Sequence, residues 1–261
     1  MDIIVCLKQV PNTAKVKMNQ DGTLLRAGVP SILNPYDHFA LAKALEIKKQ
    51  TGAKVKVLSM GPSQASEVLR LALALGSDEA YLLCDKAFAG SDTWATSYAL
   101  SLAIKKLAPY NLILCGQMAI DGDTAQTGPE IAGHLNIPQI TFCTDIELKN
   151  DTLTATKLID GGHQILEASL PVLITLTTPH NFVLPYPSFT DIFKAQQKPI
   201  FTWTPKDIDV DTSKLGLNGS PTRVIKIYPP AVKQKGQVFN LPAQAAASEI
   251  VKILQAKKVI K

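Results

Sequence analysis

The chain has 261 residues, of which 46% are hydrophobic, and its 27 basic and 22 acidic side chains give a formal net charge of +5. This length and apolar content suffice to bury a full core, so they exclude an intrinsically disordered protein and fit one large domain or two small ones. The positive charges are scattered, and no basic stripe alternates with aromatic residues, which argues against a nucleic-acid-binding protein.

The amino-terminal segment and the cysteines bear on the compartment. The chain starts MDIIVCLKQV, without a charged leader before a long apolar stretch, and no later run reaches the length of a membrane span. Cys6, Cys84, Cys115 and Cys143 lie in apolar segments without CxxC spacing, so we expect buried thiols rather than a metal site or disulfides. We therefore expect a soluble, cytoplasmic protein.

The first 135 residues predict alternating strands and helices. Apolar runs rich in β-branched residues predict strands at 2–7, 54–60, 80–84 and 112–115. Helical spacing and capping residues predict helices at 37–50, up to Gly76, from a cap at Ser91 or Asp92 to about Pro109, and from about Pro129. This alternation favours a Rossmann-like α/β fold, a mostly parallel sheet that binds adenine nucleotides and carries helices on both faces. A small hairpin is expected around Asp21 and Gly22.

The pattern changes after residue 138. Strand-like segments at 140–148, 153–159, 164–168 and 172–177 predict antiparallel strands added to the sheet. From Pro179 the chain is rich in proline, and a helix is expected at 243–257. We expect an α/β nucleotide-binding domain over residues 1–190 and an extended carboxyl-terminal arm over 191–261. Such an arm either packs on a partner surface, which we favour, or on its own domain.

The stretch from Asn111 to Leu135 combines a short buried strand, a polar loop with glycines and the start of a helix. Glycines let backbone N–H groups approach an anion, and the amino-terminal end of a helix favours negative charge. The loop from Gly116 to Gly128 therefore suits a phosphate, although it matches neither GxGxxG nor GxxxxGK[ST]. The alternative is a polar turn in which Thr124 or Thr127 caps the helix.

Residues 155–175, ATKLIDGGHQILEASLPVLIT, match the signature of the electron-transfer flavoprotein β subunit, the family that includes FixA. VCLKQVP near the start, NPYD at 34–37, the AIDGDTAQTGP loop and the closing GLNGSPTRV segment resemble the same family in the same order. The resemblance covers essentially the whole chain. It implies a flavoprotein subunit that transfers electrons and pairs with an α subunit holding its own FAD.

The resemblance also implies where a nucleotide binds. The residues carried over from the matching motifs are Cys6, Asn34, Pro35, Tyr36, Asp37, Met60, Asp92, Thr93, Thr96, Gly116, Gln117, Met118, Ala119, Ile120, Asp121, Gly122, Asp123, Thr124, Ala125, Gln126 and Thr127. In simpler members of the family this pocket holds AMP with a structural role, whereas in electron-bifurcating members it holds a second FAD that receives a hydride from NADH. The segment DTWATSYAL, from Asp92, resembles the bifurcating type, although Asp92 could equally be a helix cap.

The favoured function is flavin-based electron bifurcation. FAD would take a hydride from NADH and pass electrons to ferredoxin or flavodoxin and to a flavin-containing dehydrogenase, such as an acyl-CoA or 2-hydroxy acid dehydrogenase. One alternative is a β subunit that holds only AMP and passes electrons between dehydrogenases and the partner's FAD. Another is a nucleotide-binding sensor or assembly module without electron transfer. Because the cofactor carries the chemistry, no side chain is assigned as acid, base or nucleophile.

A loop after the last predicted strand departs from the family pattern. Many members carry an asparagine-glutamate-proline-arginine run there, but residues 180–189 read HNFVLPYPSF and lack the glutamate and the arginine. Phe182 and Leu184 are the apolar candidates for docking a dehydrogenase, because apolar anchors dominate such contacts.

Overall fold

The computed structural model describes residues 1–12, 30–149, 152–179, 182–183, 185–225, 236 and 238–260. The hairpin expected around residues 21–22 and the docking candidate Leu184 lie outside these residues. The chain divides into a compact unit, Met1–Ile225, and a second unit, Lys226–Lys261. Each unit is described by itself.

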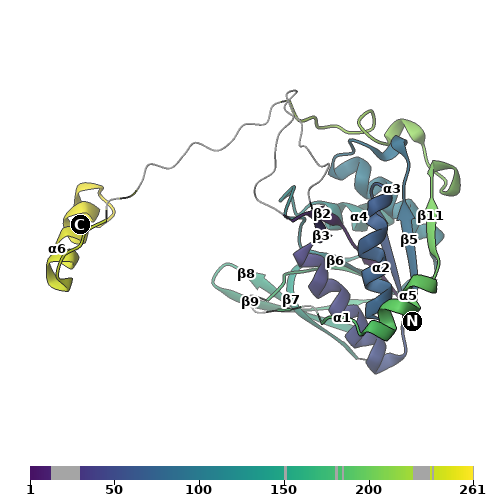
Figure 1. Ribbon diagram of the computed structural model, residues 1–261, viewed down its shortest axis with the longest axis horizontal. Coiled ribbons are helices and arrows are strands. Elements are labelled where there is room, and N and C mark those ends of the chain that lie inside the picture. The colour runs from purple at the N-terminus through teal and green to yellow at the C-terminus, as the bar shows by residue number, and fades with distance from the viewer. Residues whose placement is uncertain are drawn as a thin grey trace. The chain divides into compact units, whose positions relative to one another are not determined.

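A nine-stranded sheet forms the centre of the compact unit (Figure 1). Its strands are β1 (Asp2–Cys6), β4 (Lys54–Met60), β5 (Glu79–Leu83), β6 (Leu112–Gly116), β7 (Gln139–Lys149), β8 (Thr152–Ile159), β9 (Gly162–Ser169), β10 (Val172–Leu176) and β11 (Ile200–Trp203). They follow the order β11-β5-β4-β1-β6-β10-β7-β8-β9, parallel from β11 to β7 and antiparallel from β7 to β9. The predicted fold class, a mostly parallel α/β sheet with added antiparallel strands, is confirmed.

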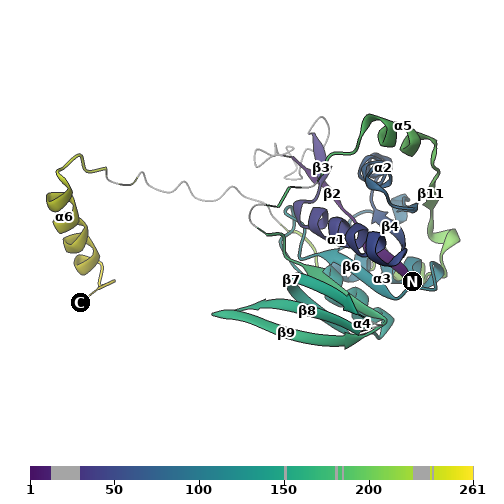
Figure 2. The ribbon, with the colours of Figure 1, turned by 90° about the horizontal axis from the view of Figure 1, so that it is seen from below.

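Four helices cover the two faces of this sheet (Figure 2). They are α1 (Pro35–Thr51), α2 (Ser66–Leu75), α3 (Thr93–Lys106) and α4 (Thr127–Leu135). Because side chains alternate along a strand, Ile3 and Val5 of β1 pack with α1 and α2, while Ile4 packs with α3 and α4. The central strands are thus buried on both faces, as the continuous apolar runs predicted.

The ends of the helices test the predicted capping residues. Gly76 ends α2 with a φ of 119°, and Asp92 caps α3 by accepting a hydrogen bond from the Ala95 N–H at 3.1 Å. Helix α4 begins two residues before Pro129, after Gln126, and no side-chain hydrogen bond caps it. Within the described residues, therefore, neither Thr124 nor Thr127 acts as its cap.

Strand β10 differs from the expectation of an antiparallel strand at 172–177. It lies between β6 and β7 and runs parallel to both. All five of its residues are buried. A continuous apolar run buried on both faces is typical of a central parallel strand, which is the physical reason for the correction.

The compact unit continues past residue 190, where the sequence analysis placed the start of the arm, as far as Ile225. Helix α5 (Phe189–Gln197) packs against α2, and β11 adds to the sheet beside β5. Arg70 on α2 holds this segment by donating to the Lys198 carbonyl oxygen at 2.6 Å. The sequence pattern missed α5 and β11 because both are short and lie at the edge of the fold, where few residues are buried.

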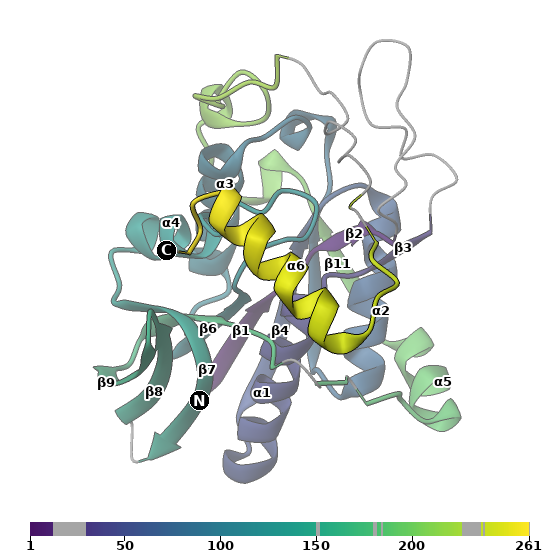
Figure 3. The ribbon, with the colours of Figure 1, turned by 90° about the vertical axis from the view of Figure 1, so that its left-hand side faces the viewer.

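The remaining elements are small. Strands β2 (Gln9–Pro11) and β3 (Ser31–Leu33) form an antiparallel pair that the sequence analysis did not predict. Figure 3 shows β7, β8 and β9 on the side of the compact unit away from α5. In the second unit, α6 (Ala243–Ala256) agrees with the helix predicted at 243–257 and has no buried residue. Across the described chain, each helix is too short or too polar to span a membrane.

Candidate nucleotide site

A cavity of about 1050 Å³ lies at the carboxyl ends of β1 and β6. The chain passes from β1 to β4 and β5 on one side of the sheet and then returns to β6 on the other side. Such a topological switch point is where open α/β sheets bind their ligands. The volume lies just above the range for small-molecule sites, about 300–1,000 Å³, so the cavity has room for a ligand as large as a dinucleotide.

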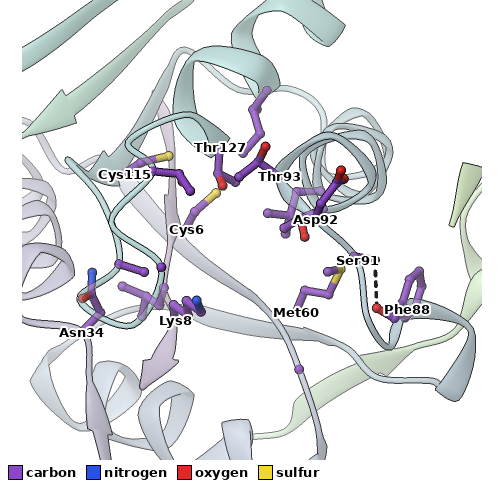
Figure 4. A pocket seen from close by; sticks show the side chains of 18 of the residues that line it. Cys6, Lys8, Asn34, Met60, Phe88, Ser91, Asp92, Thr93, Cys115 and Thr127 are labelled. Carbon is purple, nitrogen blue, oxygen red and sulfur yellow. Dashed lines mark hydrogen bonds between the residues drawn. The ribbon is translucent and has the colours of Figure 1, made fainter. Parts of the chain in front are cut away.

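Most of the site residues predicted from the sequence come together around this cavity, as Figure 4 shows for several of them. Those that line it are Cys6, Asn34, Asp37, Met60, Asp92, Thr93, Thr96, Gly116, Gln117, Met118, Ala119, Gly122, Thr124, Ala125, Gln126 and Thr127. Five predicted residues are not among the lining residues: Pro35, Tyr36, Ile120, Asp121 and Asp123.

The sequence analysis missed other lining residues. Gly61–Ser63 follows β4 and Cys84–Lys86 follows β5, and both ranges reach the cavity because parallel strands end at the same edge of the sheet. That rule could have identified them. Thr222 also lines the cavity; it lies far along the chain from the other residues, within the GLNGSPTRV segment that carries the resemblance, and no site role was predicted for it.

Asn34 shapes the loop that follows β6. Its side chain is buried, and its Nδ2 donates to the Met118 carbonyl oxygen at 2.8 Å and to Asp37 Oδ1 at 3.0 Å. Its Oδ1 accepts a hydrogen bond from the Ile120 N–H at 3.2 Å. Since both donors and the acceptor of the amide are used within the protein, Asn34 positions the loop rather than offering these groups to a ligand.

Asp37 joins three segments beneath the same loop. Its buried carboxyl accepts hydrogen bonds from the Lys8 N–H at 2.7 Å, from Asn34 and from the Gly116 N–H. Burial raises the pKa of Asp37 from 3.8 to about 7, against the lowering effect of these hydrogen bonds. The carboxyl therefore links β1, α1 and β6 at the cavity edge and titrates near neutral pH.

The raised pKa of Asp37 predicts how stability depends on pH. The folded protein holds a proton that the unfolded chain releases between about pH 4 and pH 7, so in this range rising pH should destabilise the fold by up to about 1.4 kcal/mol per pH unit. Asp37→Asn cannot titrate and should lack this component. Urea unfolding of both proteins from about pH 5 to about pH 8 measures the difference. Parallel stability curves for the two proteins would show that Asp37 does not titrate in this way.

The loop before α4 offers free backbone donors. The N–H groups of Thr124, Ala125 and Gln126 line the cavity region and have no hydrogen-bond partner among the described residues. Ala125 is left-handed with a φ of 54°, and Gln126 is right-handed with a φ of −101°. Alternating handedness of this kind turns successive N–H groups into one concavity that binds anions, and the adjacent amino terminus of α4 favours negative charge as well.

Hydroxyl groups of α3 face the same loop. The Thr93 hydroxyl donates to Glu130 Oε1 at 3.1 Å, and Gln126 Oε1 is a second, more distant acceptor at 3.4 Å. The Ser97 hydroxyl donates to Glu130 Oε2 at 3.2 Å. Burial raises the pKa of Glu130, and these hydroxyl donors oppose the rise. Glu130 thus fixes the orientation of Thr93 at the cavity wall.

Asp92 ties a distant segment to the cavity rim. Besides capping α3, its Oδ2 accepts hydrogen bonds from the Thr222 N–H at 2.9 Å and from the Thr222 hydroxyl at 2.8 Å. The Asp92 N–H donates to Ser220 Oγ at 2.8 Å. Burial alone would raise the pKa of Asp92, but the hydrogen bonds from Ala95, Thr222 and Ser220 lower it overall. The predicted cofactor role of Asp92 therefore competes with a structural one that occupies both oxygens.

Lys8 supplies positive charge at the cavity. Its ammonium group pairs with Asp121 Oδ1 at 2.6 Å, and its side chain is 47% exposed. Asp121, a predicted nucleotide-binding residue, pairs with Lys8 and does not line the cavity; a carboxylate facing a phosphate would repel it.

The docking candidate Phe182 is half-buried. Its ring packs edge-on against Phe39, with 5.1 Å between ring centroids. Among the described residues of this region, Val183, Tyr186 and Phe189 are exposed apolar side chains. These three are accessible to another protein.

Comparison with known proteins places these features in a family context. Residues 21–208 match the family model described as the electron transfer flavoprotein domain. The chain is 49% identical over 261 residues to the electron transfer flavoprotein subunit beta of Clostridium acetobutylicum, with both chains fully covered. It is 43% identical over 263 residues to the caffeyl-CoA reductase-Etf complex subunit CarD of Acetobacterium woodii, again with full coverage of both. It is 42% identical over 260 residues to protein FixA of Bradyrhizobium diazoefficiens, covering 96% of this chain and 90% of the relative.

Proposed function

The chain belongs to the electron transfer flavoprotein β-subunit family, which includes FixA, and from this we propose that it binds FAD in the cavity and takes a hydride from NADH for electron bifurcation. In this proposal the chain pairs with an α subunit that holds a second FAD. The electrons pass to ferredoxin or flavodoxin and to a flavin-containing dehydrogenase. The name of the CarD relative, a subunit of a caffeyl-CoA reductase-Etf complex, supports a dehydrogenase-type partner.

The observation that carries the proposal is the group of free N–H donors at Thr124, Ala125 and Gln126 beside the large cavity. Successive N–H groups that have no partner among the described residues can donate to one anion, so a phosphate group that accepts from them would stabilise the loop. The cavity volume favours a dinucleotide such as FAD over the smaller AMP.

The side chains of this protein would hold and shield the cofactor rather than react with it. When bound, FAD would supply the chemistry of hydride acceptance and of single-electron transfer. Leu58, Met60, Leu100 and Ile131 give the cavity an apolar wall that excludes water. The Thr93 hydroxyl, held by Glu130, is a polar group fixed at the cavity surface. The apolar wall would pack against the planar flavin ring, and the Thr93 hydroxyl would face one polar edge of that ring.

Cofactor analysis of the complex with its α subunit tests this proposal. Denaturation should release about two FAD and no AMP per heterodimer if both subunits hold FAD. Gly122→Val should lower the FAD content to about one per heterodimer. Gly122 lines the cavity, and a Cβ there meets no protein atom within 4 Å. The added side chain should therefore occupy space that the ligand needs without disturbing the fold.

Gly162→Val is the matched control. Gly162 lies on β9, outside the lining residues, and a Cβ there also meets nothing within 4 Å. This variant should keep the full cofactor content. About one FAD and one AMP in the unaltered complex would make the cavity an AMP site and contradict the bifurcation proposal. Equal cofactor loss in both variants would contradict the assignment of the loop that contains Gly122 as part of the FAD site.

A further inference from the structure

We propose that Cys6 and Cys115 form a redox-active dithiol on the cavity wall, which hydrogen peroxide converts to a disulfide. The inference rests on the placement of the two thiols and is independent of the cofactor proposed above. It differs from the expectation of buried thiols without disulfides, because Cys6 is only half-buried and both residues line the cavity.

The strand register brings the two residues together. Cys6 of β1 is directly paired with Cys115 of β6, and these strands are parallel neighbours. Neighbouring strands lie about 4.8 Å apart, which falls within the Cα separation of about 4.4–6.8 Å that disulfides require. Both side chains pack with the apolar layer beneath α3 and α4, so they project from the same face of the sheet.

The two side chains also lie near each other. Cys6 contributes to the raised pKa of Cys115, and Figure 4 shows both thiols on the cavity wall close to Thr127. Cys6 is the last residue of β1, and Cys115 is followed by Gly116, the last residue of β6. The pair thus lies at the ends of its strands, where a small adjustment of the backbone disrupts little of the ladder.

The two thiols have different roles in the reaction. Cys6 is half-buried whereas Cys115 is buried, and the nearby Cys6 together with burial raises the pKa of Cys115, so Cys6 is the thiol that reacts first. Its sulfur attacks one oxygen of the peroxide, the O–O bond breaks, one water leaves and Cys6 becomes a sulfenic acid. The Cys115 sulfur then attacks the Cys6 sulfur, an S–S bond forms, the S–O bond breaks and a second water leaves. The two thiols lose two electrons to one peroxide.

The other cysteines cannot take part in this bridge. Cys84 lines the cavity, but it follows β5, which is separated from β1 by β4. Cys143 is buried on β7, which is separated from β6 by β10. Two strand spacings, about 10 Å, exceed the reach of a disulfide. Cys84 is therefore a natural control inside the same cavity.

Peroxide treatment of the purified full chain tests the inference. After remaining thiols are alkylated and the protein is digested, mass spectrometry should find peptides of Cys6 and Cys115 joined by a bond that dithiothreitol reverses. Cys84→Ser should give the same joined peptides in the same yield. Cys115→Ser should give none, and its Cys6 should instead accumulate as sulfenic and sulfinic acid.

Three results would overturn the inference. One is the oxidation of Cys6 to sulfinic acid in the unaltered chain without any joined peptide. Another is joining of Cys84 to either thiol at comparable yield. The third is a Cys6 that oxidises identically in the unaltered chain and in Cys115→Ser, which would show that Cys115 does not resolve the intermediate. Cys115→Ala serves as a second variant, because it removes the thiol with no polar group left behind.

Discussion

Gly116→Ala should lower the free energy of unfolding of the compact unit by about 2–6 kcal/mol. A Cβ at Gly116 would lie 2.7 Å from the carbonyl carbon of Tyr36 and 2.8 Å from the Asp37 nitrogen, and no real Cβ approaches backbone atoms so closely. The start of α1 must then move away from β6. Overpacking of this kind costs about 1–3 kcal/mol. Displacing the buried Asp37 carboxyl from its hydrogen bonds adds about 1–3 kcal/mol.

Urea unfolding followed by circular dichroism measures this effect, and Gly122→Ala is its control. Gly122 lies in the same loop, but a Cβ there meets no atom within 4 Å, so the substitution should change the stability by less than about 0.5 kcal/mol. Equal stability of the two variants would mean that α1 does not approach the end of β6 as closely as described. Loss of stability only in Gly116→Ala would confirm that the start of α1 lies directly against the end of β6.

Deleting residues 226–261 should reduce the amount of α subunit that co-purifies with the chain by at least about tenfold, a change of about 1.4 kcal/mol or more. The compact unit ends at Ile225, and its buried apolar residues all lie before that point, so it should stay folded. In the second unit α6 buries none of its residues, and Ile250 and Val251 remain about half exposed. An amphipathic helix without a core of its own gains stability by binding a partner surface.

Point substitutions separate the apolar face of α6 from the mere presence of the arm. Ile250→Ser should weaken co-purification, because it removes an apolar anchor. Lys252→Ser, on the same helix, removes an exposed charge and should leave co-purification nearly unchanged. A heterodimer that forms equally well after the deletion would show that the arm contributes nothing to the partner interface.

The sequence alone determined the features that depend on neighbours along the chain. Apolar runs located β1, β4, β5 and β6, because a central strand must be apolar on both faces. Gly76 and Asp92 marked helix ends, because capping is settled within one turn. The loop after β6 was recognised as a candidate ligand site, because a strand, a glycine-containing loop and a helix start follow one another directly.

The tertiary structure alone decided which distant residues meet. Local patterns could not show that β10 inserts beside β6, that Thr222 reaches Asp92 or that Asn34 holds the loop at Met118, since each contact joins segments far apart in sequence. Nor could they show that Cys6 faces Cys115, because a shift of one residue in strand register would turn the two thiols to opposite faces of the sheet. Spacing along the chain carries no information about register between strands; that depends on how the whole sheet packs.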